Sequence, residues 1–361
     1  MKVLILTCNT GGGHNAAAKA ISKELTSRNI ENEVKDALEF VPKAKKEIIE
    51  NGHSIVYKYA PNLFGEGYEF MDKQPHNHLL YMDFSRYAFI LSNYITEHSF
   101  DTAICVHEFP AIMLSNARNL YQLDIKQYFV ATDYTCSPGV NDLIVDKWFI
   151  PFGIKKEFVE KGIKEDCIVE TGIPIDSINY EYIDKHDARK KLGIRDEVSL
   201  ILISAGTFGC GPVGEIARQS KKLSDGKAEI VVLCGKNKNL LKELAVEIED
   251  GLFFPVGFTD KVRLFMAAAD VLITKAGGLS TTEAASSGLP MVFINAIPGL
   301  ETHNLNFFIN NGCGVTSDTV NGICNLAKEL YEDKEKASKI IENQKKLFSI
   351  NSVKLLVDNI I

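Results

Sequence analysis

Short runs of apolar and β-branched residues recur along this chain, and each is followed by a glycine-bearing turn and a segment with helical periodicity. Runs that are apolar throughout indicate strands buried on both faces of a sheet. Strands that alternate with helices form parallel sheets covered by those helices. The runs form two series, the first at 2–6, 101–106, 127–133 and 147–153, the second at 199–206, 228–235, 252–258, 270–277 and 290–296. The sequence therefore predicts an α/β protein with two doubly wound parallel sheets.

The length of 361 residues agrees with two domains, because single hydrophobic cores stop growing at about 250–300 residues. We place the N-terminal domain at 1–173 and the C-terminal domain at 198–345. The stretch 174–197 is polar, rich in charge and led by a proline, so we expect an interdomain linker there. Residues 346–361 have the pattern of a C-terminal helix, for which we consider packing back onto the N-terminal domain.

Charge and cysteine content argue against several classes of protein. The net charge of −7 disfavours nucleic-acid binding, which needs a basic face. The eight cysteines are scattered without CxxC spacing, which is typical of reduced thiols in a cytoplasmic protein. We expect no signal peptide, because the chain opens on a core strand. The apolar runs are too short to span a bilayer, so we expect any membrane contact to be peripheral.

The stretch 41–100 fits the alternating pattern worst, because it is dense in Tyr, Phe and Leu with interleaved Lys. One interpretation is a set of ordinary helices that pack on the first sheet. The alternative is a partly exposed aromatic and basic surface that lies on a bilayer.

Three glycines and a histidine separate the first strand from the first helix, in the order Thr10-Gly11-Gly12-Gly13-His14. Glycine allows close approach of a ligand to the backbone, and a following helix presents unpaired N–H groups. The turn is therefore a candidate site for an anionic or hydroxyl-bearing ligand beside an imidazole. A tight turn with a surface histidine is the alternative.

Four turns of the second series carry glycines or polar side chains, and the carboxyl ends of parallel strands meet at one edge of a sheet. Phosphate oxygens suit the glycines and hydroxyls, and a ribose suits a carboxylate in a first helical turn. The sequence thus predicts a nucleotide-like ligand at this edge. The candidates are Gly206, Thr207 and Gly209; Lys236 and Asn237; Gly277, Gly278, Ser280, Thr281 and Glu283; and Glu301, Thr302 and Asn304.

These segments resemble a known family. The turns KAGGLSTTEAASSGLP (275–290) and GLETHN (299–304), with SAGTFGCGP (204–212) and CGKN (234–237), are similar to the donor domain of GT-B nucleotide-sugar glycosyltransferases. TGGGH, ATDY (131–134) and ETGIPID (170–176) are similar to the monogalactosyldiacylglycerol synthase and processive diacylglycerol glucosyltransferase group of glycosyltransferase family 28. The resemblance extends from residue 3 to about residue 315.

The resemblance implies a GT-B fold, with an acceptor and membrane-associating domain, a UDP-sugar donor domain and a central cleft. It implies that Gly206, Thr207, Gly209, Gly277, Gly278, Ser280 and Thr281 contact the UDP phosphates, that Lys236 and Asn237 line the uracil pocket, that Glu283 holds the ribose, and that Glu301 and Thr302 read sugar hydroxyls with Asn304 nearby. His14 would act as the acceptor-side base, next to Gly12 and Gly13. The family usually has KAGPGT where this chain has Lys275-Ala276-Gly277-Gly278-Leu279-Ser280.

The expected reaction moves glucose or galactose from a UDP-sugar to diacylglycerol at the inner face of the cell membrane, with an anionic membrane surface as partner. An imidazole titrates near pH 6.5 and suits a general base, and helix N-termini stabilise a leaving diphosphate. We expect inverting transfer with no metal and no cofactor besides the co-substrate, since no DxD-type pair stands at the donor turns.

Other possibilities stay open at this point. Asp133 either orients the base or ends a strand, and His107 with Glu108 either binds acceptor or caps the next helix. The enzyme could transfer GlcNAc to another lipid, such as an undecaprenyl-linked acceptor, or be a UDP-GlcNAc 2-epimerase, which would need further carboxylates and no bilayer. A nucleotide-sugar-binding protein without turnover is the third class. The choice between glucose and galactose is not decided by these residues.

Overall fold

The computed structural model describes residues 1–9, 12–49, 67, 70, 86–140, 143–204, 206, 209, 211–248, 253–294 and 299–361. Contacts divide the chain into two compact units. Unit 1 comprises Met1–Ser177, Ile297–His303 and Ile350–Ile361, and unit 2 comprises Ile178–Ala296 and Asn304–Ser349. The chain therefore leaves unit 1, builds most of unit 2, and returns to unit 1 for its last segment.

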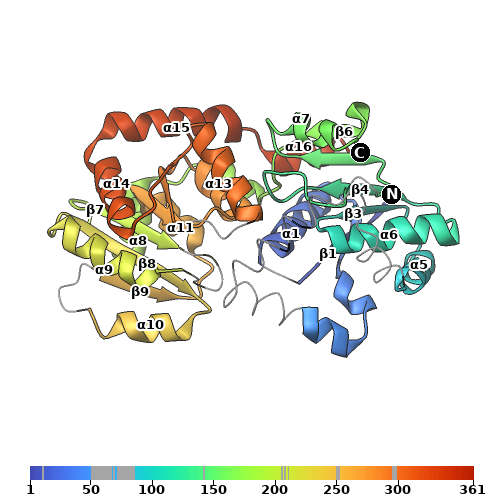
Figure 1. Ribbon diagram of the computed structural model, residues 1–361, viewed down its shortest axis with the longest axis horizontal. Helices are drawn as coiled ribbons and strands as arrows, with labels where there is room; N and C mark the ends of the chain where they lie inside the picture. Colours follow the sequence, from blue (N-terminus) through green and yellow to red (C-terminus); the bar gives the residue numbers. More distant parts are fainter. Residues whose placement is uncertain are drawn as a thin grey trace. The chain divides into compact units, whose positions relative to one another are not determined.

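Unit 1 is built on a six-stranded sheet whose neighbouring strands are parallel (Figure 1). The strands are β1 (Lys2–Thr7), β2 (Glu31–Asp36), β3 (Thr102–Cys105), β4 (Lys126–Val130), β5 (Lys147–Ile150) and β6 (Ile168–Glu170), in the order β2-β1-β3-β4-β5-β6. The first strand thus has the second on one side and the third on the other, so the winding direction reverses at β1.

Helices cover both faces of this sheet. α1 (Gly12–Ser27) and α16 (Ser352–Asp358) bury their apolar residues with those of β1, β3, β4 and β5 in one cluster. α6 (Glu108–Tyr121) packs against β4, where the buried amide of Gln127 donates to the carbonyl oxygen of Ala111 at 2.9 Å. The remaining elements are η1 (Ala37–Phe40), α5 (Ala88–Glu97), α7 (Lys155–Glu160), η3 (Glu165–Cys167) and η4 (Ser177–Tyr180).

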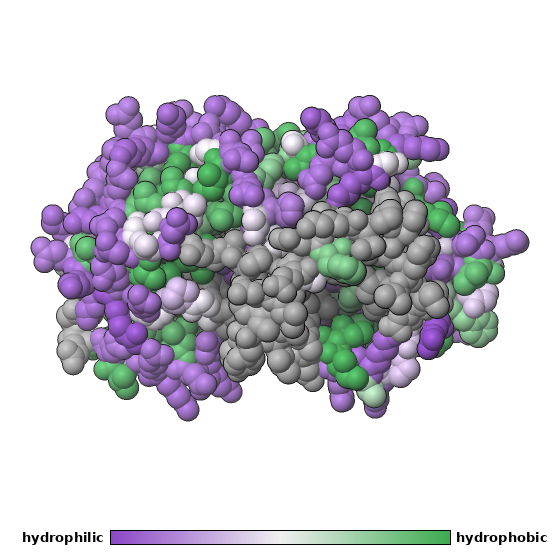
Figure 2. Space-filling model, in the orientation of Figure 1, coloured by the Kyte–Doolittle hydropathy of each residue, from purple (hydrophilic) through white to green (hydrophobic). Residues whose placement is uncertain are grey.

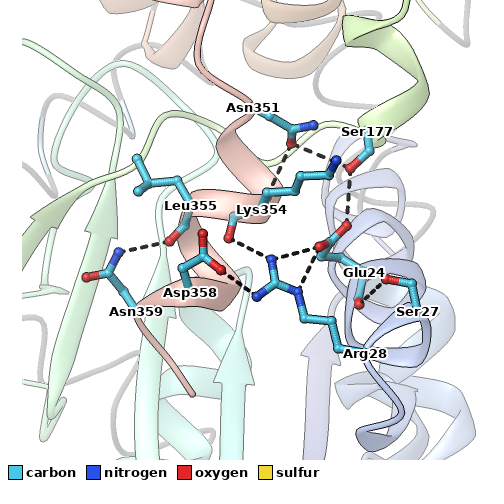
Figure 3. A network of polar contacts seen from close by, with 9 residues as sticks. All are labelled: Glu24, Ser27, Arg28, Ser177, Asn351, Lys354, Leu355, Asp358 and Asn359. Atoms are coloured by element: carbon cyan, nitrogen blue, oxygen red, sulfur yellow. Dashed lines mark hydrogen bonds and ion pairs between the residues drawn. The ribbon is translucent and has the colours of Figure 1, made fainter.

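The C-terminal helix α16 is fixed to α1 by polar contacts at the edge of their apolar interface (Figure 3). Arg28, the residue directly after α1, pairs with Glu24 in the last turn of α1 at 2.8 Å and with Asp358 on α16 at 2.5 Å. Ser177 also contacts Glu24, at 3.2 Å, and Asn351 at 3.5 Å. Ser177, the last residue before the chain first leaves unit 1, and Asn351, just after its final return, are therefore linked next to the C-terminal end of α1.

The first residue of α16 packs against the segment ETGIPID (170–176). The Ser352 hydroxyl donates to the carbonyl oxygen of Ile173 at 2.7 Å and accepts from the Ile175 N–H at 3.4 Å. Gly172 has φ +82°, and a Cβ there would lie 3.1 Å from Cβ of Ser352. Glycine at this position therefore allows both the turn and the close approach of α16.

Unit 2 has a second six-stranded parallel sheet, in the order β12-β11-β10-β7-β8-β9. Its winding direction reverses at β7, which lies between β8 and β10. The strands are β7 (Ser199–Ser204), β8 (Ala228–Gly235), β9 (Phe253–Gly257), β10 (Val271–Thr274), β11 (Met291–Phe293) and β12 (Val315–Thr316). The helices are α8 (Lys185–Leu192), α9 (Val213–Ser224), α10 (Lys238–Ala245), α11 (Val262–Ala268), α12 (Gly278–Ser286), α13 (Leu300–Asn310), α14 (Val320–Glu332) and α15 (Lys334–Phe348).

One face of the second sheet packs against α9, α10 and α14 in a single apolar cluster. The outer face of α15 is largely hydrophilic, as Figure 2 shows. The structure differs from the expected linker 174–197, because α8 packs on α11 and its Arg189 is buried against Asp270 at 2.7 Å. Residues 178–197 form part of unit 2, whereas 174–177 belong to unit 1.

The prediction of two doubly wound parallel sheets is confirmed, while the central cleft stays a prediction. Most of the aromatic stretch 41–100 lies outside the described residues, so neither interpretation of it is decided. No described helix combines the length and the apolarity needed to cross a bilayer. The seven cysteines described are free thiols, six of them buried.

Candidate active site

Three neighbouring strands of unit 1 bring polar groups together where the sheet reverses its winding. Open α/β sheets bind ligands at the carboxyl ends of their strands, at such a switch point. The turn after β1 leads to His14 in α1, the end of β3 leads to Val106, and the end of β4 leads to Thr132. The side chain of His14 contacts both of the others.

The imidazole of His14 is oriented by oxygen atoms on Nδ1. That nitrogen is 2.9 Å from the carbonyl oxygen of Val106 and 3.0 Å from Oγ1 of Thr132. A carbonyl oxygen only accepts hydrogen bonds, so Nδ1 carries the proton of the neutral ring. Nε2 then has a free lone pair, and no residue that the structure describes is hydrogen-bonded to it. This arrangement suits a general base.

Gly12, Gly13 and His14 lie in the first turn of α1, whereas the sequence places them in a loop before a helix that starts near residue 15. Their N–H groups belong to the unpaired first turn of the helix. A Cβ at Gly13 would meet no described atom within 4 Å. Asn15 fixes this helix end, because its side-chain oxygen accepts from the Thr7 hydroxyl at 2.9 Å.

His107 is the N-cap of α6, so the structure confirms the capping interpretation for this residue. Its Nδ1 accepts from the Phe109 N–H at 3.1 Å. Its ring also meets that of His14 edge-on, with centroids 4.6 Å apart. His107 is almost fully buried, with 9% exposed, and it forms one wall beside the candidate base.

Glu108 is the acidic group of this cluster. Burial alone would raise its pKa, but the charge of His107, a hydrogen bond from Ser137 and the charge of His14 together hold the pKa of this carboxyl below its ordinary value. One carboxylate oxygen lies 3.4 Å from Nδ1 of His107. Asp133 directly follows Thr132 and is half-buried, and its catalytic role stays a prediction.

The second candidate site lies at the switch point of unit 2, between the turns after β7 and β10. Gly206 and Gly209 both have positive φ, +73° and +55°. A Cβ at Gly206 would lie 3.0 Å from Cε of Lys275, and one at Gly277 would lie 4.0 Å from the same atom. The Lys275 side chain thus extends along both glycine turns and places a cation where two strands meet.

Asn237 supports this site from the next strand. Its side-chain oxygen caps α10 by accepting from the Leu240 N–H at 3.0 Å, and its amide donates to the Gly209 carbonyl oxygen at 3.2 Å. The preceding Lys236 lies over the ring of Phe258, with Nζ 5.9 Å from the centroid. Phe258 follows β9 and is 71% exposed, which leaves an aromatic face accessible at this edge of the sheet.

The turn after β10 ends in an uncapped helix, because the N-cap of α12 is Gly277 and no side chain caps it. The buried Thr281 hydroxyl bonds to the carbonyl oxygens of Gly277 and, at 3.1 Å, Gly278. It therefore stabilises the turn from within. Ser280 and Glu283 are half-buried. The N–H groups of this helical turn are suited to an anion.

Asn304 is fully buried and its amide donates to the carbonyl oxygen of Ala276 at 3.0 Å, so it holds the β10 turn from α13. Glu301 is buried and Thr302 is exposed, both in the first turn of α13. These two residues belong to unit 1 by their contacts, whereas Asn304 belongs to unit 2. Thr207 lies outside the described residues.

Three residues of these sites were not among the sequence candidates: Thr132, Lys275 and Phe258. Thr132 and Lys275 stand inside motifs quoted above, each at the carboxyl end of a strand, and this position is the signal that could have found them. Among the described residues, no three His, Cys, Asp or Glu side chains gather as metal ligands.

Two family models match the chain. Residues 14–175 match the model described as monogalactosyldiacylglycerol (MGDG) synthase, and residues 200–360 match the model described as glycosyltransferase family 28 C-terminal domain. Relatives named processive diacylglycerol beta-glucosyltransferase include one from Bacillus pumilus, 28% identical over 100% of this chain and 94% of its own length. The one from Bacillus subtilis is 27% identical with the same coverage, and the one from Staphylococcus carnosus is 24% identical over 96% and 88%.

Solved structures share the fold along the whole chain. Acinetobacter baumannii MurG has a TM-score of 0.65 with 15% identity, over 99% of this chain and 98% of its own. Anabaena Alr3699/HepE in complex with UDP has a TM-score of 0.61 with 15% identity, over 100% and 99%. A Neisseria meningitidis UDP-GlcNAc 2-epimerase bound to UDP-GlcNAc has a TM-score of 0.64 with 14% identity, over 100% and 99%. These likenesses show the GT-B fold, which an epimerase shares, whereas the two family models describe a synthase and a glycosyltransferase. The chain is thus a glycosyltransferase whose N-terminal half matches the monogalactosyldiacylglycerol synthase family and whose C-terminal half matches the C-terminal domain of family 28.

Proposed function

We propose that this enzyme transfers a hexose from a UDP-sugar to the free hydroxyl of diacylglycerol. The names of its full-length relatives support the acceptor, and the UDP held by the structural neighbour HepE supports the donor. The observation that carries the proposal is the orientation of His14, whose Nδ1 faces the carbonyl oxygen of Val106 and leaves Nε2 free as a base.

The proposed step is a direct displacement. Nε2 of His14 takes the proton of the acceptor hydroxyl, the acceptor oxygen forms a bond to C1 of the sugar, and the bond from C1 to the UDP oxygen breaks. Attack opposite the leaving group inverts the configuration at C1. In this proposal the base is a residue of unit 1, and the glycine turns that bind the donor are in unit 2.

The leaving diphosphate needs positive charge, which unit 2 supplies without a metal in this proposal. The uncapped N-terminus of α12 offers backbone N–H groups, and Lys275 adds a cation along the Gly206 turn. The accessible ring of Phe258, beside Lys236, offers a surface on which a uracil ring stacks. No cofactor other than the sugar nucleotide takes part.

The acceptor is dissolved in a bilayer, so we propose peripheral association with the inner face of the cell membrane. Unit 1 exposes an apolar patch on α5 and the end of α6, which Figure 2 shows as green side chains over α5. Its members Phe89, Ile90, Leu120 and Tyr121 are each 45–58% exposed, and the rings of Phe89 and Tyr121 are 5.5 Å apart. Exposed aromatic and aliphatic side chains of this kind partition into the interface of a bilayer.

The test is incubation of the purified protein with vesicles that contain diacylglycerol and anionic lipid, and with UDP-glucose, UDP-galactose or UDP-GlcNAc in turn. Mass spectrometry follows UDP release and lipid products. We expect a hexosyl-diacylglycerol from one donor, and loss of at least about a hundredfold in rate in His14→Gln with UDP affinity unchanged. His186→Gln, an exposed histidine on α8, is the matched control. UDP binding without any lipid product would overturn the acceptor, and the same samples would then reveal epimerised UDP-GlcNAc.

A further inference from the structure

The nitrogen Nδ1 of His14 has one hydrogen and two oxygen neighbours. The carbonyl oxygen of Val106 is at 2.9 Å and Oγ1 of Thr132 is at 3.0 Å. The two oxygens come from the ends of β3 and β4, which are adjacent strands of the sheet. The ring is therefore held from two sides by rigid elements, and Thr132 itself is 8% exposed.

The chemistry of the two oxygens differs. A carbonyl oxygen accepts only, so Val106 requires the hydrogen on Nδ1. A hydroxyl oxygen accepts or donates, so Oγ1 of Thr132 can accept a second hydrogen bond from the same Nδ1–H group. In the opposite tautomer, the lone pair of Nδ1 would face the Val106 carbonyl oxygen at hydrogen-bond distance, which is repulsive. Only the tautomer with a free Nε2 satisfies both contacts.

The Glu108 carboxylate contacts the neighbouring histidine of the cluster, since it lies 3.4 Å from Nδ1 of His107, whose ring meets that of His14 edge-on. The two oxygens at Nδ1 of His14, from Val106 and Thr132, are both neutral. Hydrogen bonds to neutral oxygens strengthen when the donor becomes charged, as Nδ1–H does when Nε2 takes a proton.

We propose that Thr132 is a positioning residue for His14. Its hydroxyl oxygen and the Val106 carbonyl oxygen together fix the ring with Nε2 towards the acceptor and stabilise the imidazolium that forms during transfer. The inference rests on the proposed function, since it assigns to Thr132 the part that a carboxylate plays beside many catalytic histidines. Thr132 is not itself a catalytic residue, because it acts through His14.

Two substitutions and one control test this role. Thr132→Val keeps the shape of the side chain and removes the hydroxyl, whereas Thr132→Ser keeps the hydroxyl. Thr135→Val is the matched control, because Thr135 is a buried threonine of the same segment whose hydroxyl bonds Glu157 at 2.5 Å instead. Steady-state kinetics with the lipid acceptor give kcat and KM for each variant.

We expect Thr132→Val to lower kcat about 10- to 100-fold with an unchanged KM for the UDP-sugar, and Thr132→Ser to stay within about threefold of the wild type. Thr135→Val should keep its kcat. An unchanged kcat in Thr132→Val would overturn the inference. So would an equal fall in Thr135→Val, because the loss would then reflect the segment rather than the contact to His14.

A spectroscopic arm does not depend on turnover. Long-range ¹⁵N–¹H NMR spectra of histidine-labelled protein distinguish the two imidazole tautomers, and the signals of His14 among the eight histidines are those lost in His14→Gln. We expect a neutral ring protonated on Nδ1 in the wild type, and a second ring state in Thr132→Val. A wild-type His14 ring protonated on Nε2 would refute the positioning role of Thr132, even if lipid transfer is observed. Absence of transfer with the expected tautomer would instead refute the proposed function.

Discussion

Position 206 requires glycine for two reasons, its backbone conformation and the space that the Lys275 side chain occupies. The φ of +73° at Gly206 is strained for any side chain, and a Cβ would come within 3.0 Å of Cε of Lys275. The positive φ affects the stability of the turn, and the approach to Lys275 affects the position of a cation at the proposed phosphate site. A pair of glycines in this chain separates the two effects.

Gly193 has nearly the same backbone angle, φ +71°, but a Cβ at this position would meet no described atom within 4 Å. Gly206→Ala and Gly193→Ala should each lower the free energy of unfolding by about 1 kcal/mol, because the left-handed conformation is strained for alanine at both positions. Only Gly206→Ala should also weaken UDP binding, by about tenfold, since Lys275 must move. Calorimetric titration with UDP and chemical denaturation measure the two quantities. Equal UDP affinity in both variants would contradict the placement of Lys275.

Because of Glu108, the free energy of unfolding should decrease as the pH becomes acidic. The folded-state pKa of Glu108 is held below the ordinary 4.5, so the unfolded chain binds its proton more readily. The stabilisation is complete above about pH 4.5 and is lost as the pH falls through the lowered pKa. Glu108→Gln should therefore destabilise the protein at pH 6, and the difference from wild type should shrink as the pH falls below 4. Urea denaturation at several pH values tests this, and a difference that grows towards acid pH would contradict it.

At the scale of whole elements, α16 contributes more to the stability of unit 1 than its short length suggests. Val353, Leu356, Val357 and Ile360 are at most 8% exposed and belong to the same cluster as the central strands. The ion pair between Arg28 and Asp358, in contrast, lies at the surface. The apolar face of the helix, and not its polar contacts, should dominate its stabilising effect.

Leu356→Ala should accordingly lower the stability of unit 1 by about 3 kcal/mol, because it leaves a cavity in a closed core. Asp358→Ala should cost about 0.5 kcal/mol, as expected for a partly exposed pair. Thermal unfolding, monitored through the fluorescence of the single tryptophan Trp148 on β5, reports on unit 1. If the two variants were equally unstable, the network of Figure 3 would be more important than the core contact.

The central strands were predictable because they are apolar throughout, as 2–6 and 199–206 illustrate. The edge strands β2, β6 and β12 escaped prediction, since they are short or polar and only partly buried, as Glu31–Asp36 shows. The start of α1 was placed too late because glycine disfavours helix, yet tertiary contacts to Asn15 and His14 hold this turn. The oxygen partners of His14 depend on which strands are neighbours, which no local pattern reveals.

At the scale of the whole molecule, charge and the proposed membrane contact oppose each other. The net charge of −7 repels an anionic bilayer, so the apolar patch on α5 and α6 has to supply the attraction. Raising the salt concentration from about 0.05 M to about 0.5 M should leave vesicle binding unchanged or stronger, because it screens the repulsion. Leu120→Ser together with Phe89→Ser should reduce binding at least about tenfold. Flotation of vesicles measures both, and binding that falls steeply with salt would instead assign the contact to basic residues.

The return of the chain to unit 1 has a consequence during synthesis. Unit 2 is complete once the chain has been made up to Ser349, whereas the core of unit 1 needs residues up to Ile360. On the ribosome, the half that emerges first has an open apolar face until the last helix arrives. The first half to be made is thus the last to complete its core.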